Sequence, residues 1–299
     1  MNLYIKKSQN IKKFLIGFFI FIASILMLIY YSNNCIQTTY LNFENDKVKK
    51  PITIIHLSDL HEKFFGPDNK ILIDKIKKEN PDLIFITGDI ATFSGSSLKI
   101  VEPKNIKRYN HNIEYTINIL NRVAAVAPTY LSLGNHEHVF EKFDYGLDKY
   151  RKIVKNTGVT LLINEIDEIN VKGTKVNILG TDNAYYQDMH INDLIKEFEK
   201  LDGVKFVLDH YPTNFALNGK FSYINYDVDY VLSGHEHGGQ IRIPFIGGIF
   251  AHEEGIFPKY SEGVHEKNNV TLIISRGLGN STLPIRIFNR PELIVIEIK

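Results

Sequence analysis

The chain has 299 residues, of which 44% are hydrophobic, and a formal net charge of +1. This apolar content suits one large domain or two small ones, and the balanced charge gives neither a basic patch typical of nucleic-acid binding nor an acidic tail typical of disorder. The single cysteine, Cys35, excludes an intrachain disulfide and a cysteine-based metal cluster.

The first predicted element is a helix at residues 14–31, FLIGFFIFIASILMLIYY, which has no charged residue. A helix that spans a bilayer needs about 17 to 25 apolar residues, so this run is long enough. By the positive-inside rule, the lysines before it keep the N-terminus in the cytoplasm and place the rest of the chain outside. These lysines are Lys6, Lys7, Lys12 and Lys13. Tyr30 and Tyr31 fit an interfacial aromatic belt.

The chain is therefore predicted to have a cytoplasmic basic segment (1–13), a transmembrane anchor (14–31), a polar tether (32–50) and a folded domain (51–299). A cleaved signal peptide is the alternative, but no A-x-A cleavage site follows the apolar run. A buried soluble helix is disfavoured because the run is apolar on every face. We expect a single-pass protein of the cell membrane, with its domain on the extracytoplasmic side.

Beyond the anchor, strand-like and helix-like segments alternate, which predicts an α/β layered domain. Short apolar, β-branched runs predict strands at 38–44, 51–59, 82–89, 128–135, 159–164, 165–173, 176–182, 205–212, 229–239, 269–277 and 291–298. Amphipathic spacing predicts helices at 70–81, 113–126, 144–158 and 193–203. The irregular stretch 91–112 is long for a connection and is expected to be a lid or substrate loop.

Residue types that bind metals follow five of the predicted strands, usually beside glycine. They are Asp59 and His61, then Asp89, then Asn135 and His136, then His210, and finally His235 and His237. Ligands of α/β sheets bind at the carboxyl ends of the strands. Imidazole suits zinc, copper, iron and nickel, and carboxylate suits manganese and magnesium. The set is large enough for two adjacent ions bridged by a carboxylate, about 3.5 to 4 Å apart.

Each of these signals has an ordinary alternative. An aspartate at a strand end is more often a helix cap, and Gly-Asn and Gly-Asp are common turn dipeptides. The succession of such residues after five apolar runs favours a metal site over these alternatives. The remaining histidines lack this setting and are expected to be structural or solvated. They are His56, His111, His138, His190, His252 and His265.

Taken together, these motifs resemble the calcineurin-like metallophosphoesterase family, whose signature is D-x-H, G-D, G-N-H-[DE], H and G-H-x-H. They stand here as Asp59-Leu60-His61, Gly88-Asp89, Gly134-Asn135-His136-Glu137, His210 and Gly234-His235-Glu236-His237. Residues 234–244 and 275–293 also look like the membrane-anchored bacterial branch of the family. Glu137 and Glu236 depart from the commonest residues at their positions, but neither is a family metal ligand.

The resemblance implies a layered β-sandwich flanked by helices and preceded by one transmembrane helix. It also implies two divalent metal ions, of manganese, iron or zinc. One ion would be held by Asp59, His61, Asp89 and His237, and Asp89 would bridge to a second that Asn135, His210 and His235 complete. His136 would be free of metal and act as the catalytic histidine, oriented by Asp59.

The implied function is hydrolysis of a phosphodiester or pyrophosphate bond in an envelope or lipid-linked substrate by metal-activated water. The alternatives are a broad-range phosphomonoesterase or nuclease, and a non-catalytic metal-binding scaffold. The arginines Arg242, Arg276 and Arg286 are candidates for phosphate contact, since guanidinium pairs bidentately with phosphate; simple solvation is the alternative for each. Residues 91–112 and 250–268 are expected to shape the substrate pocket. No nucleic-acid or protein partner is predicted.

Overall fold

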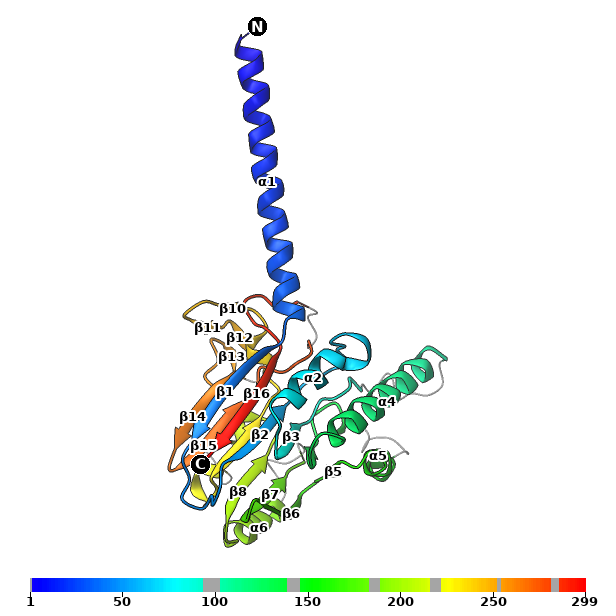
Figure 1. Cartoon of the computed structure of the whole chain (residues 1–299), viewed down its shortest axis with the longest axis vertical. Helices are drawn as coiled ribbons and strands as arrows, with labels where there is room; N and C mark the ends of the chain where they lie inside the picture. The colour runs from blue at the N-terminus through cyan, green and yellow to red at the C-terminus, as the bar shows by residue number, and fades with distance from the viewer. Residues whose placement is uncertain are drawn as a thin grey trace.

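The computed structural model describes residues 2–93, 103–138, 146–182, 189–215, 222–251, 254–280 and 285–299. A long helix, α1 (Asn2–Asn34), projects away from a folded domain that contains the other described elements (Figure 1). The other α-helices are α2 (Lys70–Lys78), α4 (Pro103–Ala124), α5 (Gly146–Lys155) and α6 (Met189–Phe198). Short 3-10 turns lie at Pro67–Asn69, Pro212–Phe215, Tyr223–Asn225 and His237–Gly239.

Two six-stranded sheets form the centre of the domain. The first has the order β1-β16-β2-β3-β4-β5, with bounds Gln37–Phe43, Glu292–Ile298, Ile52–Leu57, Leu83–Thr87, Thr129–Ser132 and Thr160–Leu161. The second has the order β14-β15-β9-β8-β7-β6, with bounds Gly263–Lys267, Val270–Ile274, Tyr230–Ser233, Val204–Leu208, Thr174–Gly180 and Glu165–Val171. Two small ribbons pair β10 (Arg242–Ile243) with β11 (Gly247–Gly248), and β12 (Phe250–Ala251) with β13 (Gly255–Ile256).

The sheets pack face to face because alternate residues of each strand point to opposite sides. Ile54 of β2 and Phe85 of β3 belong to a buried cluster that also holds Phe206 of β8, so this cluster lies between the sheets. Ile55, the neighbour of Ile54, packs instead in the cluster that contains Leu72 of α2. A third cluster covers the other face of the second sheet with α6. The predicted β-sandwich flanked by helices is thus confirmed.

Strand direction brings the site and α1 to the same end of the domain. Strands β2, β3 and β4 run parallel to one another. Strand β1, which follows α1, runs parallel to β16, and β16 runs antiparallel to β2. The carboxyl end of β2 therefore lies at the edge where α1 joins the sheet (Figure 1).

The junction between α1 and the domain is tight. Ser32 and Asn33, at the end of α1, are buried, and the Asn33 side chain donates a 3.1 Å hydrogen bond to the carbonyl oxygen of Arg286. The Arg290 guanidinium donates to the carbonyl oxygens of Cys35 and Ile36, at 2.9 Å each. The segment predicted as a polar tether, 32–50, therefore begins with the helix end and continues as β1 within the first sheet.

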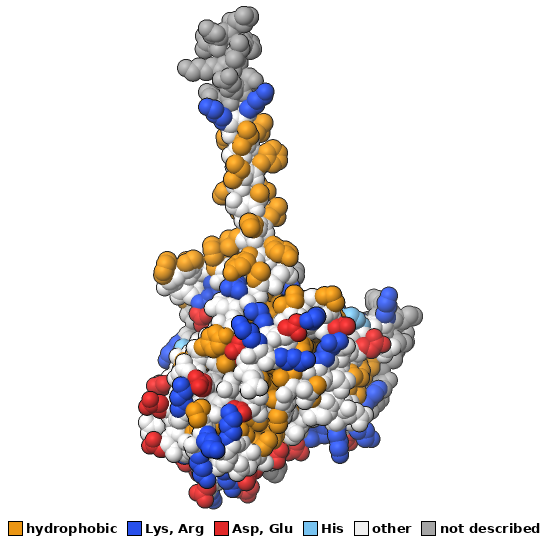
Figure 2. Space-filling model, viewed as in Figure 1, with side chains coloured by type: hydrophobic (Ala, Val, Ile, Leu, Met, Phe, Trp, Pro, Cys, Tyr) orange, Lys and Arg blue, Asp and Glu red, His pale blue; other side chains and the backbone are white. Residues whose placement is uncertain are grey.

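Among the described residues, one helix is long and apolar enough to cross a membrane, the segment Lys12–Asn34 with a mean hydropathy of 2.5. Its hydrophobic side chains are exposed along most of its length (Figure 2). The exact limits of the basic segment, the anchor and the domain stay predictions.

Helix α4 is longer than the sequence predicted. It begins at Pro103, so residues 103–112, predicted to be irregular, are helical. Tyr109 and Asn112 face inward with Tyr115 and Thr116, and the Asn112 side chain donates to the carbonyl oxygen of Thr92. A buried asparagine on the inner face hides the amphipathic pattern. Of the rest of the predicted lid, Ala91 and Phe93 are buried, and residues 94–102 lie outside the described residues.

Candidate metal centre

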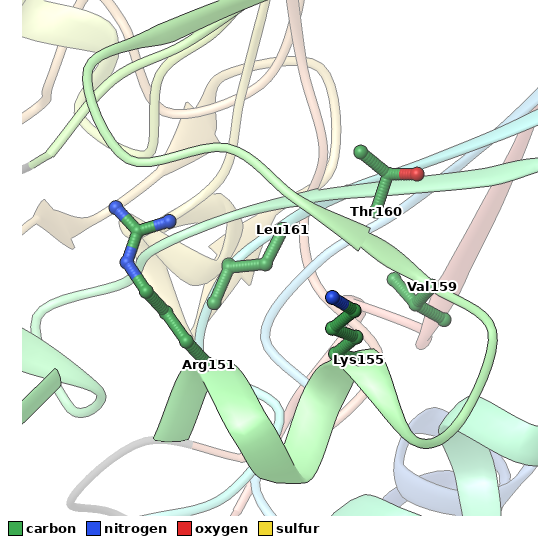
Figure 3. A pocket seen from close by; sticks show the side chains of 5 residues that line it. All are labelled: Arg151, Lys155, Val159, Thr160 and Leu161. Atoms are coloured by element: carbon green, nitrogen blue, oxygen red, sulfur yellow. The ribbon is translucent and has the colours of Figure 1, made fainter. Parts of the chain in front are cut away.

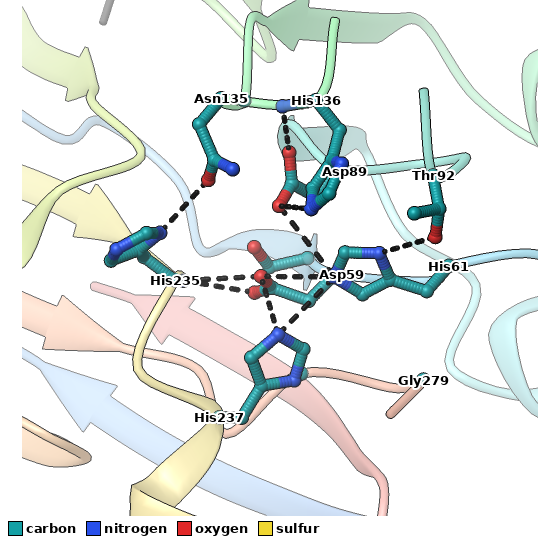
Figure 4. Close-up of polar contacts among 12 residues, drawn as sticks. Asp59, His61, Asp89, Thr92, Asn135, His136, His235, His237 and Gly279 are labelled. Carbon is teal, nitrogen blue, oxygen red and sulfur yellow. Dashed lines mark hydrogen bonds and ion pairs between the residues drawn. The ribbon is translucent and has the colours of Figure 1, made fainter. Parts of the chain in front are cut away.

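The predicted metal ligands converge at the carboxyl ends of the parallel strands. Asp59 and His61 follow β2, Asp89 follows β3, and all three have left-handed backbone conformations, with φ of 52°, 44° and 53°. Such conformations cost non-glycine residues about 1–3 kcal/mol each and persist where the surrounding structure enforces them. Figure 4 shows these side chains turned toward a common centre.

One half of the centre is formed by Asp59, His61 and His237. The Nε2 atom of His237 lies 3.3 Å from Oδ1 of Asp59 and 3.2 Å from Nε2 of His61. Nε2 of His61 lies 3.5 Å from Oδ2 of Asp89. These nitrogens and carboxylate oxygens come from three separate loops and face one another, the arrangement expected around a cation.

The other half is formed by Asn135, His210 and His235. Oδ1 of Asn135 lies 3.0 Å from Nδ1 of His235 and 3.2 Å from Nε2 of His210. Nε2 of His210 also lies 3.3 Å from Oδ2 of Asp89. Asp89 therefore stands between the two halves, where a bridging carboxylate is needed.

The outer nitrogens of two histidines fix which ring atom faces the centre. Nδ1 of His210 lies 2.6 Å from the carbonyl oxygen of Thr87, which can only accept a hydrogen bond. Nδ1 of His61 lies 3.1 Å from Oγ1 of Thr92, whose own proton is donated to Glu62. Both histidines thus carry a proton on Nδ1 and turn Nε2 toward the centre, and Nε2 is the atom that such imidazoles offer to a metal.

The donor set fits two divalent ions. In three groups of residues, the ligand atoms lie within 4.8 Å of one another. The groups are Asp59 with His61 and His237, His61 with Asp89 and His136, and Asp59 with Asp89 and His210. Imidazole, carboxylate and amide donors together suit borderline cations such as zinc, iron and manganese. The assignment of individual ligands to each ion stays a prediction.

The buried charges of the centre act strongly on one another. Burial raises the pKa of Asp59 to about 6 and lowers the pKa of His61 to about 4. Burial opposes the charged forms of Asp89 and His210 too, but the attraction between them holds the pKa of Asp89 well below its usual value and raises the pKa of His210 to about 10. Two buried carboxylates surrounded by imidazoles favour a bound cation as counter-charge.

His136 stands beside this centre with a different set of contacts. Its amide donates to Oδ1 of Asp89 at 2.9 Å, and its Nδ1 lies 2.9 Å from the carbonyl oxygen of Phe93. Its Nε2 lies 4.0 Å from Oδ2 of Asp89, and the side chain is 27% exposed. The Phe93 carbonyl therefore holds the Nδ1 side of the ring, and the orienting role of Asp59 expected from the sequence stays a prediction.

Glu137 has a part in the site that the sequence analysis missed. Its side chain is fully buried, and its two carboxylate oxygens accept hydrogen bonds of 2.8, 2.8 and 2.9 Å from the amides of Asp89, Ile90 and Gly134. It thereby ties the loop after β3 to the loop after β4. Burial and the neighbouring Asp89 raise the pKa of Glu137 to about 7. Its position beside the asparagine and histidine of GNHEH was the available signal.

Glycine is required where the loops touch. Gly88 has a φ of 78°, and a side chain there would collide with the backbone of Gly134. A side chain on Gly234 would collide with Ser58 and with the carboxylate of Asp59. These contacts explain the glycine in the G-D, G-N-H-E and G-H-E-H motifs.

The three candidate substrate arginines have partners within the protein. Arg286 is fully buried, donates to the carbonyl oxygens of Arg276 and Gly279, and lies 3.3 Å from Nδ1 of His237. Arg276 pairs with Glu292 at 2.8 Å, and Arg242 pairs with Glu262. Their contact with substrate stays a prediction, and the structure gives Arg286 a supporting position behind a candidate ligand.

The remaining histidines have the ordinary settings expected of them where the structure describes them. His56 is buried beside Thr87 at 2.9 Å, His138 lies 3.2 Å from Asp182, and His265 contacts the carbonyl oxygen of Glu262. His111 is exposed on α4. The side chain of His190, and His252 altogether, lie outside the described residues.

A cavity of about 350 Å³ lies elsewhere, between α5 and β5 (Figure 3). It is lined by Arg151, Lys155, Val159, Thr160 and Leu161. None of the candidate ligands lines it, so it is separate from the metal centre.

Comparison with known proteins identifies the fold and chemistry of the domain. The family model described as calcineurin-like phosphoesterase matches residues 52–239. The uncharacterized metallophosphoesterase YkuE of Bacillus subtilis is 28% identical over 250 residues, covering 82% of this chain and 78% of the relative. The phosphodiesterase YaeI of Escherichia coli is 27% identical over 254 residues, covering 83% and 82%.

The solved structures that match are more distant in sequence. Phosphopantetheinyl hydrolase from Mycobacterium tuberculosis matches with a TM-score of 0.43 and 13% identity, covering 74% of this chain and 88% of that one. The purple acid phosphatase PPD1 from yellow lupin matches with a TM-score of 0.45 and 15% identity, covering 85% and 50%.

Proposed function

Because this chain belongs to the calcineurin-like phosphoesterase family, we propose that it is a membrane-anchored, two-metal hydrolase of a phosphodiester or pyrophosphate bond in an envelope or lipid-linked substrate. The observation that carries the proposal is the convergence of seven candidate ligands from five loops on one centre, with Asp89 between its two halves. The name of its relative YaeI, a phosphodiesterase, supports a diester.

Two divalent ions would be held by Asp59, His61, Asp89 and His237 on one side, and by Asp89, Asn135, His210 and His235 on the other. When bound, such ions polarise the phosphoryl group, activate water as the nucleophile and stabilise the attacking and leaving oxygens. No nucleophilic side chain is then required.

His136 is proposed to donate a proton to the leaving group. Its Nδ1 proton is engaged by the carbonyl oxygen of Phe93, so Nε2 is the atom that exchanges protons. This atom lies at the partly exposed face of the centre, 4.0 Å from Asp89. A histidine placed in this way contributes about 10²- to 10⁴-fold as a general acid.

The proposed location follows from α1. Its apolar segment Lys12–Asn34 has the length and composition of a membrane span, and the lysines on its N-terminal side favour a cytoplasmic N-terminus. The domain would then work on the extracytoplasmic face, where phosphoesters of the envelope are found.

The test is hydrolysis of bis-p-nitrophenyl phosphate and p-nitrophenyl phosphate by the full chain in detergent. The protein is stripped of metal and refilled with manganese, zinc, magnesium, nickel or iron, with His136→Ala as the control. The proposal is supported if the parent cleaves the diester in a metal-dependent way and His136→Ala does not. Cleavage of the monoester alone would favour a phosphomonoesterase, and absence of cleavage with two ions bound would favour the binding scaffold.

A further inference from the structure

Large hydrophobic side chains are exposed on the two small ribbons and a neighbouring loop. Six of them are referred to as the apolar rim: Ile243, Phe245, Ile246, Ile256, Phe257 and Phe288. Single exposed hydrophobic residues are ordinary, but a cluster of this kind marks a contact surface. Hydrophobic side chains gather around the foot of α1 in Figure 2, where Figure 1 places β10 to β13.

The apolar rim reaches back along the membrane helix. A cavity of about 300 Å³ at the foot of α1 is lined by Leu28 and Tyr31 of the helix together with Pro244, Phe288 and Arg290 of the domain. The same cavity is lined by Ser32 and Gln37, and Pro244 immediately precedes Phe245, so the tip of the β10–β11 ribbon lies beside the last turns of α1. A bilayer whose boundary lies near Tyr31 therefore reaches this tip.

The length of α1 places Leu28 inside the membrane. The candidate span Lys12–Asn34 has 23 residues, which is about 34 Å at 1.5 Å per residue. A hydrocarbon core is about 30 Å thick. With Lys12 and Lys13 in the headgroups of one leaflet, Leu28 lies within the other leaflet and Tyr31 close to its boundary.

Hydrogen bonds attach the domain directly to the end of α1. Asn33 is bonded to the carbonyl oxygen of Arg286, and Arg290 is bonded to the backbone of Cys35 and Ile36. The guanidinium of Arg290 also lies 4.6 Å from the ring centre of Tyr31. The apolar rim is thus held at a fixed height on the helix.

Cations lie at the depth expected for lipid headgroups. The ammonium of Lys63 is 3.3 Å from the Asn34 side chain at the end of α1, and Arg290 stacks on Tyr31 one turn earlier. Basic groups just outside an inserted apolar surface attract anionic headgroups. An apolar surface bordered by such cations fits a lipid surface.

We propose that the apolar rim inserts into the leaflet from which α1 emerges, so that the catalytic domain contacts the bilayer beside its anchor. The site and the rim are one structural unit: Asn289, next to Phe288, donates to the carbonyl oxygens of His237 at 2.7 Å and Gln240 at 3.1 Å. Insertion therefore fixes the metal centre near the headgroups, and the substrate class is a phosphoester carried by a membrane lipid. The inference rests on the proposed function in that α1 crosses the membrane.

The chain contains no tryptophan, so a single introduced tryptophan reports its own surroundings. The experiment compares Phe245→Trp with Glu266→Trp in the full chain, reconstituted in phosphatidylglycerol and phosphatidylethanolamine vesicles with and without brominated acyl chains. Glu266 is an exposed residue of β14 that pairs with Thr271, which in turn pairs with Tyr230 at the amino end of β9. It therefore lies at the end of the sheet away from the metal centre.

We expect the Phe245→Trp emission to shift to shorter wavelength and to lose most of its intensity in brominated vesicles, whereas Glu266→Trp keeps the emission of a solvated indole. A Phe245→Trp emission that stays solvated overturns the proposal. A shifted emission that bromine leaves unquenched also overturns it, because the rim would then be covered by protein, such as a second copy of the chain.

Two further measurements separate this inference from the proposed function. Extraction with alkaline carbonate reports whether α1 crosses the membrane. Release of the protein would refute both the membrane anchor and the insertion of the apolar rim. Retention of the protein without bromine quenching would refute the insertion alone. Metal-dependent cleavage of a water-soluble diester by Phe245→Trp reports that the variant folds. Quenching in a protein that cleaves no phosphoester would leave the rim supported and refute the proposed activity.

Discussion

The carboxylate of Glu137 accepts a 2.8 Å hydrogen bond from the backbone amide of Asp89, the residue between the two halves of the metal centre. The same carboxylate oxygen also accepts a bond from the amide of Gly134 at 2.9 Å. One buried side chain thus sets the distance between the loop that carries Asp89 and the loop that carries Asn135 and His136.

We expect Glu137→Gln to weaken both the fold and the metal centre. The amide group of glutamine has one acceptor oxygen, so at least one of the three backbone amides loses its partner, at a cost of about 1–3 kcal/mol. Urea denaturation should show this loss in the metal-free protein, and metal analysis should show lower occupancy at limiting metal. Unchanged stability and unchanged occupancy would mean that the loops hold their positions without Glu137.

His136→Ala and Asp89→Ala should separate catalysis from metal binding. The ring of His136 lies edge-on against that of His61, 5.0 Å between centroids, and its Nε2 is 4.0 Å from Asp89, while its amide donates to the Asp89 carboxylate. Because the amide bond to Asp89 does not depend on the side chain, His136→Ala should retain two ions and lower kcat by about 10²- to 10⁴-fold. Asp89→Ala removes the central carboxylate and should lose ions as well as turnover. Metal content and kcat are measured on the same preparations, and equal metal loss in the two variants would refute a separate role for His136.

Arg286→Met tests whether this arginine supports His237 or contacts the substrate. The guanidinium is buried against two carbonyl oxygens and His237, and a carbonyl left without its donor costs about 1–3 kcal/mol. We expect lower stability and a higher metal concentration for half-maximal activity, with KM close to that of the parent at saturating metal. A KM that stays raised at saturating metal would instead support the phosphate contact predicted from the sequence.

Stability should fall in acid because of His56. Burial lowers the pKa of His56 to about 3 from its ordinary value of 6.5, so between these values the unfolded chain binds a proton that the folded chain excludes. The free energy of unfolding should therefore decrease as the pH falls below about 6.5, by up to about 1.4 kcal/mol per pH unit from this group.

The matched variant is His56→Gln, which cannot titrate. Urea denaturation of metal-free protein from pH 6.5 to pH 4.5 should give a slope shallower by close to one proton in the variant. Parallel slopes in the two proteins would show that His56 is protonated as readily in the fold as in the unfolded chain.

The sequence predicted the candidate metal ligands better than the residues that hold them in position. Asp59, Asp89 and His210 each follow an apolar strand, and parallel strands bring their carboxyl ends together, so local pattern was sufficient to place them in one site. The role of Glu137 depends on amides of a different loop, which no periodicity reveals. The Nδ1 side of the His136 ring is likewise held by Phe93, a residue 43 positions away.

The N-terminal junction shows the same limit. The polarity of residues 32–50 indicated a tether, but Asn33 is buried and bonds to the carbonyl oxygen of Arg286. Arg286 lies 253 residues further along the chain, so the local sequence does not reveal this contact. The first part of α4 was missed because Asn112, a polar residue, occupies its inner face and bonds to Thr92. In both places a long-range contact reverses the preference of the local sequence.

The place of β16 in the first sheet sets the order in which the molecule can assemble. β16 lies between β1 and β2, and within the described residues it is the neighbour through which β1 joins the sheet. Contacts between segments so far apart in the chain form late, since the intervening loop must close first. The strands that follow β1 can therefore pair with one another before β1 pairs with β16 and attaches α1 to the sheet. The height of the domain above the membrane becomes fixed when β16 docks.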